Sequence, residues 1–185
     1  MRIFEELLAA SPLNTRFRLE TSWSFTETAW LEHAFHDDRA AMSDFREAMH
    51  LLRTITAADP GNQRARLETG KLELTEAPTV ERAEGIAASA GVLRDALSIF
   101  DQALKLDPTN DDARVHYAQT ELSYGDLQMR LAHHDWCAGE IYYQHALAAA
   151  SAVKDDRSAT SVFDMQKTRD ALRSRLEKCR SSASQ

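Results

Sequence analysis

A four-residue pattern recurs in this chain at an interval of 48 residues, and it limits the possible folds more than any other feature. The copies are Ser-Pro-Leu-Asn at 11–14, Asp-Pro-Gly-Asn at 59–62 and Asp-Pro-Thr-Asn at 107–110. An arginine follows seven residues after the start of each copy, so the match extends beyond a simple turn signal. A repeat of this length indicates stacked supersecondary units that bury their apolar faces against each other.

The chemistry of the pattern predicts a helix boundary at each copy. Ser or Asp directly before Pro is typical of a helix start, because the side-chain oxygen accepts a free backbone N–H and Pro occupies a position where no N–H is needed. Each copy is therefore predicted to end one helix and to begin the next.

Composition favours helices and argues against several classes of partner. The chain has 185 residues, of which 43% are hydrophobic, and only 6 Gly and 4 Pro, which suits a helical domain with a substantial core. The net charge of −7 argues against nucleic acid and against acidic membrane surfaces as partners. The chain has no apolar run of membrane-spanning length, and its first residues include acids too early for a secretory signal, which predicts a cytoplasmic protein. Cys137 and Cys179 are then expected to be two reduced packing residues.

Hydrophobic periodicity places the helices between these joints. The predicted helical ranges are 3–10, 15–35, 39–58, about 65–77, 80–89, 90–106, 111–132, 136–153 and 161–179. Pro78 is expected to kink or break the chain, because proline lacks a donor and clashes with the preceding turn. A polar linker is predicted at 154–160 and a disordered tail at 181–185.

One stretch of the second unit resembles the second helix of a tetratricopeptide repeat. In that family, small, aromatic, small and proline positions follow one another at fixed spacing, as do Ala96, Phe100, Ala103 and Pro108. The small residues let two helices approach closely, and the aromatic ring fills the groove between them. Further matches are Ala41-x3-Phe45-x2-Ala48, Phe4-x2-Leu7-Leu8-x3-Pro12-x-Asn14, and the close-packing small residues Ser22, Gly70 and Ala118.

The resemblance implies an all-α, right-handed α-solenoid of about three long antiparallel helix hairpins with a C-terminal capping helix. As a single domain over 1–180, it comprises a half-repeat at 1–12, repeats at about 13–60, 61–108 and 109–157, a cap at 158–180 and then the tail. The usual repeat of the family has about 34 residues. The longer form is similar to the repeat regions that follow the kinase domain in many bacterial serine/threonine protein kinases, although none of the kinase's own motifs is in this sequence.

The beginning of the chain adds two alternatives. Met1 falls within what would be the second helix of a unit, so the partner of that helix is missing. Either the chain is a piece of a longer protein, or this end docks onto something, which allows a homo-oligomer through the incomplete half-repeat.

Recurring arginines form the first candidate site. Arg18, Arg66 and Arg114 occupy equivalent positions, so stacked units would place them in a row. Such a row could bind an acidic or carboxylate-bearing segment. The alternative is a set of structural salt bridges between units, with partners available at Glu20, Glu68, Glu73 and Glu121.

The first helices of the repeats provide the second candidate site. If the alignment with the repeat family holds, the inner face of the solenoid carries Arg16, Leu19, Trp23 and Thr26, then Arg64, Leu67, Lys71 and Leu74, then Asp112, Val115, Gln119 and Leu122. Arg16, Arg64 and Lys71 would anchor a peptide, with Gln119 beside them and Trp23 as a hot-spot side chain. The alternative is a solvated face whose charges have no binding role.

Catalytic and metal chemistry have little support. His133, His134, Asp135 and Cys137, or His33, His36 and Asp37, have spacings that could contribute to a zinc site, but neither group supplies a complete ligand set. The sequence contains no nucleophile elbow, phosphate loop or His-Glu-x-x-His motif, and we expect no metal and no cofactor. The aromatic residues Tyr124, Trp136, Tyr142 and Tyr143 are expected in the core.

The sequence therefore predicts a non-catalytic protein-interaction scaffold that binds a protein or peptide on its inner face. One alternative is a regulatory or sensor segment of a bacterial serine/threonine kinase system, with a kinase domain as its partner. The other is a helical-bundle metal-binding protein or enzyme that uses the His and Cys clusters.

Overall fold

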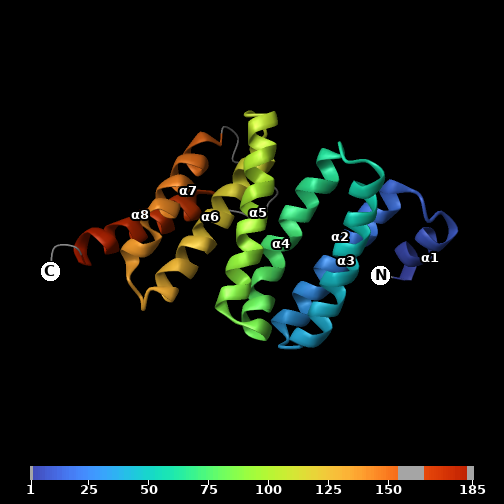
Figure 1. The fold of residues 1–185 in the computed structure, drawn as a ribbon, viewed down its shortest axis with the longest axis horizontal. Coiled ribbons are helices and arrows are strands. Elements are labelled where there is room, and N and C mark those ends of the chain that lie inside the picture. Colours follow the sequence, from blue (N-terminus) through green and yellow to red (C-terminus); the bar gives the residue numbers. More distant parts are fainter. Residues whose placement is uncertain (1, 154–164, 183–185) are drawn as a thin grey trace. The chain divides into compact units, whose positions relative to one another are not determined.

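The structure is a computed structural model that describes residues 2–153 and 165–182, and all regular secondary structure in these ranges is helical (Figure 1). This confirms the all-α prediction. The elements are α1 (Arg2–Ala10), α2 (Thr15–Ala34), α3 (Asp38–Ala58), α4 (Gln63–Glu84), α5 (Ile86–Leu106), α6 (Asp111–Leu131), the 3-10 turn η1 (Trp136–Gly139), α7 (Glu140–Ala152) and α8 (Met165–Ser182).

The chain divides into two compact units, which we call unit 1 (Met1–Val92) and unit 2 (Leu93–Gln185). In unit 1, α2 packs against α1 and α3, and α3 packs against α4. In unit 2, α6 packs against α7, and α7 packs against α8. Helices that follow one another in sequence are thus neighbours within each unit.

The recurring pattern ends one helix and begins the next as predicted, but a different residue caps the new helix. Asn14 accepts the backbone N–H of Arg16 at 3.0 Å, and Asn62 and Asn110 accept those of Ala65 and Ala113 at 3.0 and 2.9 Å. The aspartates at 59 and 107 instead accept a backbone N–H two residues on, within the turn. The expectation of capping by the residue before proline was therefore wrong, because proline lies inside the turn and the helix begins after the asparagine.

The turns within successive helix pairs contain a left-handed residue at regular spacing. His36, Gly85 and His134 have φ angles of 66°, 97° and 69°, and they follow one another at intervals of 49 residues. Positive φ is costly for a residue with a Cβ atom, so each histidine is kept in this conformation by the surrounding turn.

The turn at Gly85 corrects the prediction for the second pair. Of the kink or break expected at Pro78, the break does not occur, because α4 continues through Pro78 to Glu84, and α5 begins at Ile86 rather than at residue 90. Pro78 lies on the exposed side of α4. Water can therefore hydrate the carbonyl group that proline leaves without a donor, which reduces the cost of an internal proline.

Helices α3 and α5, and the segment of η1 and α7, share one buried spacing of i, i+4, i+7, i+11 and i+14. The buried sets are Ala41, Phe45, Ala48, Leu52 and Ile55; Ser89, Leu93, Ala96, Phe100 and Ala103; and Gly139, Tyr143, Ala146, Ala150 and Val153. When the buried sets are aligned, Ala41 corresponds to Ser89 and Ala48 corresponds to Ala96. The small-aromatic-small match at 41–48 therefore lies two helical turns earlier in its helix than the match at 96–103. The two matches are therefore not equivalent positions.

The two cysteines form a disulfide, contrary to the prediction of reduced thiols. Cys137 of η1 and Cys179 of α8 are bonded across a sequence separation of 42 residues. Disulfides persist mainly in oxidising compartments, so this bond is at odds with the reasoning that placed the chain in the cytoplasm. Helix α8 begins at Met165 and extends to Ser182, and the predicted linker at 154–160 lies outside the described residues.

Candidate binding surfaces

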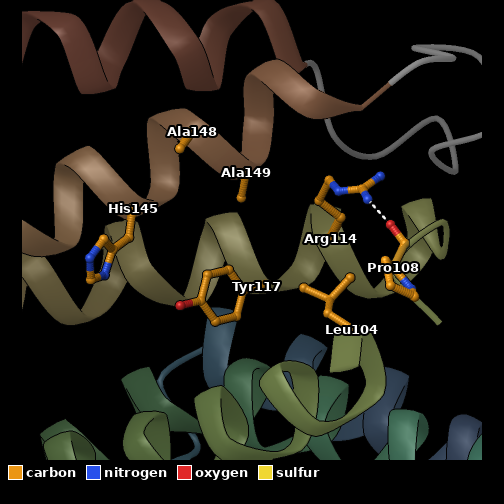
Figure 2. Close-up of a pocket in the computed structure, with 7 residues that line it drawn as sticks. All are labelled: Leu104, Pro108, Arg114, Tyr117, His145, Ala148 and Ala149. Atoms are coloured by element: carbon orange, nitrogen blue, oxygen red, sulfur yellow. Dashed lines mark hydrogen bonds between the residues drawn. The ribbon is translucent and has the colours of Figure 1, made fainter. Parts of the chain in front are cut away.

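A groove of about 370 Å³ lies on unit 2 (Figure 2). Its floor is mostly apolar, with two alanines of α7 facing the tyrosine ring of α6. Figure 2 shows an arginine of α6 at one end and a histidine of α7 at the other. The lining residues are Leu104, Pro108, Arg114, Tyr117, His145, Ala148 and Ala149.

The histidine end of the groove contains a hydrogen-bonded group around a buried carboxyl. The Tyr117 hydroxyl donates to Glu121 Oε1 at 2.7 Å, and His145 Nδ1 lies 3.3 Å from the same oxygen. Burial raises the pKa of Glu121, although both partners counteract this effect. Burial, reinforced by the hydrogen bond and charge of Glu121, also raises the pKa of the Tyr117 hydroxyl. This end can therefore offer polar contacts beside an apolar floor.

The arginine end of the groove is already occupied by internal contacts. Arg114 donates to the Asp111 carboxylate and to the Pro108 carbonyl oxygen. The alternative prediction was a salt bridge from Arg114 to a glutamate such as Glu121. The structure does not contain this salt bridge, because the carboxyl of Glu121 contacts Tyr117 and His145. Arg114 therefore shapes this end of the groove, and two of its five N–H donors are used within the protein.

Helix α2 exposes a second surface, on unit 1, which we call the α2 stripe. Its residues follow one another at spacings of three and four, which places them on one side of the helix. Trp23 and Trp30 are 56% and 52% exposed, and Leu31 and Phe35 beside the stripe are 49% and 82% exposed. The stripe consists of Arg16, Glu20, Trp23, Glu27, Trp30 and Ala34.

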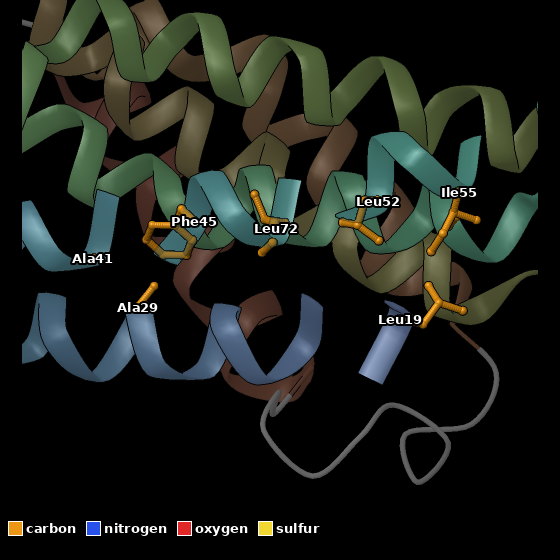
Figure 3. Close-up of a cluster of buried hydrophobic side chains, with 9 residues drawn as sticks. Leu19, Ala29, Ala41, Phe45, Leu52, Ile55 and Leu72 are labelled. Atoms are coloured by element: carbon orange, nitrogen blue, oxygen red, sulfur yellow. The ribbon is translucent and has the colours of Figure 1, made fainter. Parts of the chain in front are cut away.

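The other side of α2 packs into the core of unit 1 (Figure 3). Leu19 and Ala29 are buried there against α3, which contributes Phe45 and Leu52. Helix α2 therefore has apolar side chains on two sides, one that holds the fold together and one that faces solvent.

The predicted inner-face residues are only partly brought together. Arg16 and Trp23 share the exposed stripe, whereas Leu19, predicted on the same face, is buried. On α4, Arg64 is exposed, and Lys71 forms an ion pair with Glu68 at 3.2 Å. The structure places Gln119 in the interior with 8% of its surface exposed, so the third helix of the predicted face does not present it to a partner.

The remaining two arginines of the predicted row are half-buried. Among the described residues, the guanidinium groups of Arg18 and Arg66 have no hydrogen-bond or ion-pair partner. The structural alternative for the row, a set of salt bridges, is therefore absent at these two positions in the described part of the chain.

A polar cluster that the sequence did not indicate closes the turn between α2 and α3. Arg82 of α4 donates to the His33 carbonyl oxygen at 2.9 Å and pairs with Asp38 at 3.2 Å. His33 Nδ1 in turn lies 2.9 Å from Asp38 and 2.9 Å from the Thr79 hydroxyl. These contacts join three helices of unit 1, which indicates that His33 has a structural role.

The histidine and cysteine groups weighed as metal ligands do not converge. Cys137 is in the disulfide, and His133 and His134 lie in an exposed turn with φ angles of 56° and 69°. Within residues 2–153 and 165–182, no three His, Cys, Asp or Glu side chains come together in a way that could hold a metal ion. Of the four aromatic residues predicted in the core, Tyr124 and Tyr143 are buried, whereas Trp136 and Tyr142 are half-buried.

Comparisons of the chain with family models, with curated proteins and with solved structures gave no match. None of the described helices is long and apolar enough to cross a membrane.

Sequence reasoning identified two members of the α2 stripe and one residue of the groove. The stripe had a further signal, because two tryptophans and two glutamates each recur after seven residues. The groove had no comparable signal, since its lining comes from three helices and the turn between α5 and α6, whose packing a one-dimensional pattern does not reveal.

Proposed function

We propose that the chain is a non-catalytic protein-interaction module that binds a protein or peptide partner through the α2 stripe. The observation that carries this proposal is the exposure of Trp23 and Trp30 on one side of a helix whose other side is buried. Tryptophan is strongly enriched among the residues that dominate binding energy at protein interfaces. Large aromatic side chains grouped on a surface are typical of an interaction site rather than of a free face.

The exposed apolar area of the stripe can supply part of the binding energy. A half-exposed tryptophan leaves on the order of 100 Å² of surface in water, so docking against both rings would gain roughly 5 kcal/mol at about 25 cal/mol/Å². Adjacent Leu31 and Phe35 extend the apolar area along the helix. The costs of association reduce this gain, so flanking polar contacts must also contribute.

The finer architecture belongs to the same proposal. A tetratricopeptide-like solenoid is supported by the asparagine caps at intervals of 48 residues and by the left-handed turn residues at intervals of 49. In such an array the first helix of each pair forms the binding face, and α2 is the first helix of its pair. Residence in the cytoplasm stays a prediction.

A peptide-display selection tests the proposal. The wild-type chain and the variant Trp23→Ser/Trp30→Ser are used as baits against one library of helical peptides. We expect the wild type to enrich binders that the variant fails to retain. The matched control is Ile141→Ser, which removes a 51% exposed apolar side chain from unit 2 and should retain the same binders.

Two results would contradict the proposal. The wild type enriching no peptide would mean that the chain lacks a peptide-binding surface. Equal retention of the enriched peptides by wild type and by the tryptophan variant would place binding elsewhere, for example at the groove of unit 2. Both variants should fold, since the replaced side chains are half exposed. Circular dichroism checks this and so excludes unfolding as the cause of lost binding.

A further inference from the structure

The α2 stripe combines aromatic and acidic side chains in a regular order. Glu20, Trp23, Glu27 and Trp30 alternate along it, so that Glu27 lies four residues after one tryptophan and three residues before the other. On a helix both spacings bring side chains into neighbouring positions on the surface. The carboxylate of Glu27 is therefore flanked by an indole ring on each side.

The acidic members of the stripe are not satisfied within the protein. Glu27 is exposed and Glu20 is half-buried, and within the described part of the chain neither carboxylate has a hydrogen-bond or ion-pair partner. Other charged side chains of unit 1 do have partners, such as Lys71 with Glu68 and Arg82 with Asp38. The two carboxylates are thus available to a cation from outside.

We propose that this surface recognises a helical partner segment that presents arginine side chains seven residues apart, one beside Glu27 and one beside Glu20. The inference rests on the proposed function, and it adds the chemistry of the partner. A guanidinium group can stack on an indole ring while it donates two hydrogen bonds to a carboxylate, and its planar shape suits both contacts together. Apolar side chains of the same segment would cover the outer edges of the tryptophans.

Charge and length also favour a basic helical segment. Arg16 and Ala34, the ends of the stripe, are 18 residues apart, which is about 27 Å along the helix axis and matches a partner helix of five turns. Between these ends its charged members are both acidic. A partner with cations at a seven-residue spacing would place each of them opposite one glutamate, whereas an acidic partner would meet like charges.

The test uses the peptides enriched in the display selection with the wild-type chain. We expect arginine, and less often lysine, at two library positions seven residues apart. For one enriched peptide, fluorescence anisotropy then gives the dissociation constant with each protein variant. Replacement of the peptide arginines by citrulline, which keeps the shape and removes the charge, should weaken binding about tenfold for each residue.

Variants of the protein provide the matching half of the experiment. Glu27→Gln should weaken binding about tenfold, and Glu20→Gln with Glu27→Gln should make it insensitive to citrulline and to added salt. Glu47→Gln removes an exposed carboxylate of the same unit on α3, and it should change the affinity less than about twofold.

The outcomes separate this inference from the function on which it rests. Enriched peptides that require the tryptophans but lack cations, or that bind Glu27→Gln as tightly as wild type, would overturn the inference and leave the proposed function intact. A chain that forms a dimer disrupted by the same substitutions would show that a second copy occupies the surface, which also overturns it. A selection without any binder would overturn both.

Discussion

Reduction of the disulfide should weaken unit 2 by an amount that follows from the length of the loop it closes. The bond joins Cys137 of η1 to Cys179 of α8 across 42 residues. In the chain-entropy description, cross-linking a loop of this length removes about 4 kcal/mol of conformational freedom from the unfolded state at 25 °C. Opening the bond should therefore lower the free energy of unfolding of unit 2 by roughly that amount.

Helix α8 should nevertheless remain docked after reduction. Leu172 and Leu176 are buried, and Arg175 donates to both carboxylate oxygens of Asp126 at 2.5 and 2.6 Å. The lost stability should therefore appear as more frequent opening of the helix rather than as its permanent detachment. A loss of about 4 kcal/mol corresponds to an increase of roughly a thousandfold in the open population.

Urea unfolding of oxidised and reduced protein measures the effect. With a urea dependence of about 1–2 kcal/mol/M, the midpoint for unit 2 should fall by roughly 2–4 M. Hydrogen exchange of α8 amides locates the change, and loss of protection should be concentrated in unit 2. The double variant Cys137→Ser/Cys179→Ser is the control, because it should match the reduced protein and respond to no reductant.

Oxidised and reduced protein that unfold at the same urea concentration would contradict a stabilising role for the disulfide. Two free thiols found by mass in the non-reduced protein would likewise contradict it, since the bond would then be absent in solution. Equal loss of protection in both units would show that the stabilising effect of the disulfide is not confined to unit 2.

Three further predictions concern single side chains. Gly139→Ala should destabilise unit 2 by about 2–3 kcal/mol in urea unfolding, because a Cβ atom there would lie 2.6 Å from the backbone carbonyl oxygen of Gly125 and 2.7 Å from the Tyr143 ring. An unchanged midpoint would contradict this close packing of α6 against η1 and α7. Burial raises the pKa of Glu76 to about 7, above its usual 4.5, so its contribution to stability is fully present below pH 4.5 and is lost as the pH rises through 7. Between pH 5 and pH 8 the free energy of unfolding of the wild type should fall by at most about 3 kcal/mol, and that of Glu76→Gln should not show this fall. An equal change with pH in both proteins would contradict the assignment to Glu76. Asp126→Asn should cost about 1–2 kcal/mol by removing the ion pair with Arg175, whose two side chains are 25% and 30% exposed, whereas no change would mean that solvent screens the pair completely.

The sequence predicted most of the helices because their signals are local. The joints at 11–14, 59–62 and 107–110 and the apolar periodicity placed the ends of most helices within a few residues of those observed. The wrong boundary, at Pro78, arose where a local rule met an environment that the sequence does not show. An internal proline is costly in general, but on the exposed side of α4 the cost is lower.

Features that join distant parts of the chain were harder to predict. The disulfide needs two cysteines brought together by the packing of α8 on η1, and spacing alone gave no reason to pair them. The same limit applies to the groove of unit 2 and to Arg82, which contacts a turn 46 residues earlier at His36. Gln119 was misplaced because the predicted face assumed that equivalent helices expose equivalent positions.

The contrast between α2 and α3 explains why the binding surface was partly visible in the sequence. Helix α3 carries one apolar stripe, and this stripe is buried, so its pattern is fully accounted for by the fold. Helix α2 buries Leu19 and Ala29 yet keeps Trp23 and Trp30 on the exposed side, where the fold of unit 1 does not need them. Apolar residues in excess of what packing requires conflict with solubility, and such conflicts are expected at functional surfaces. The second apolar side of α2 is therefore a stronger indication of function than any single residue in it.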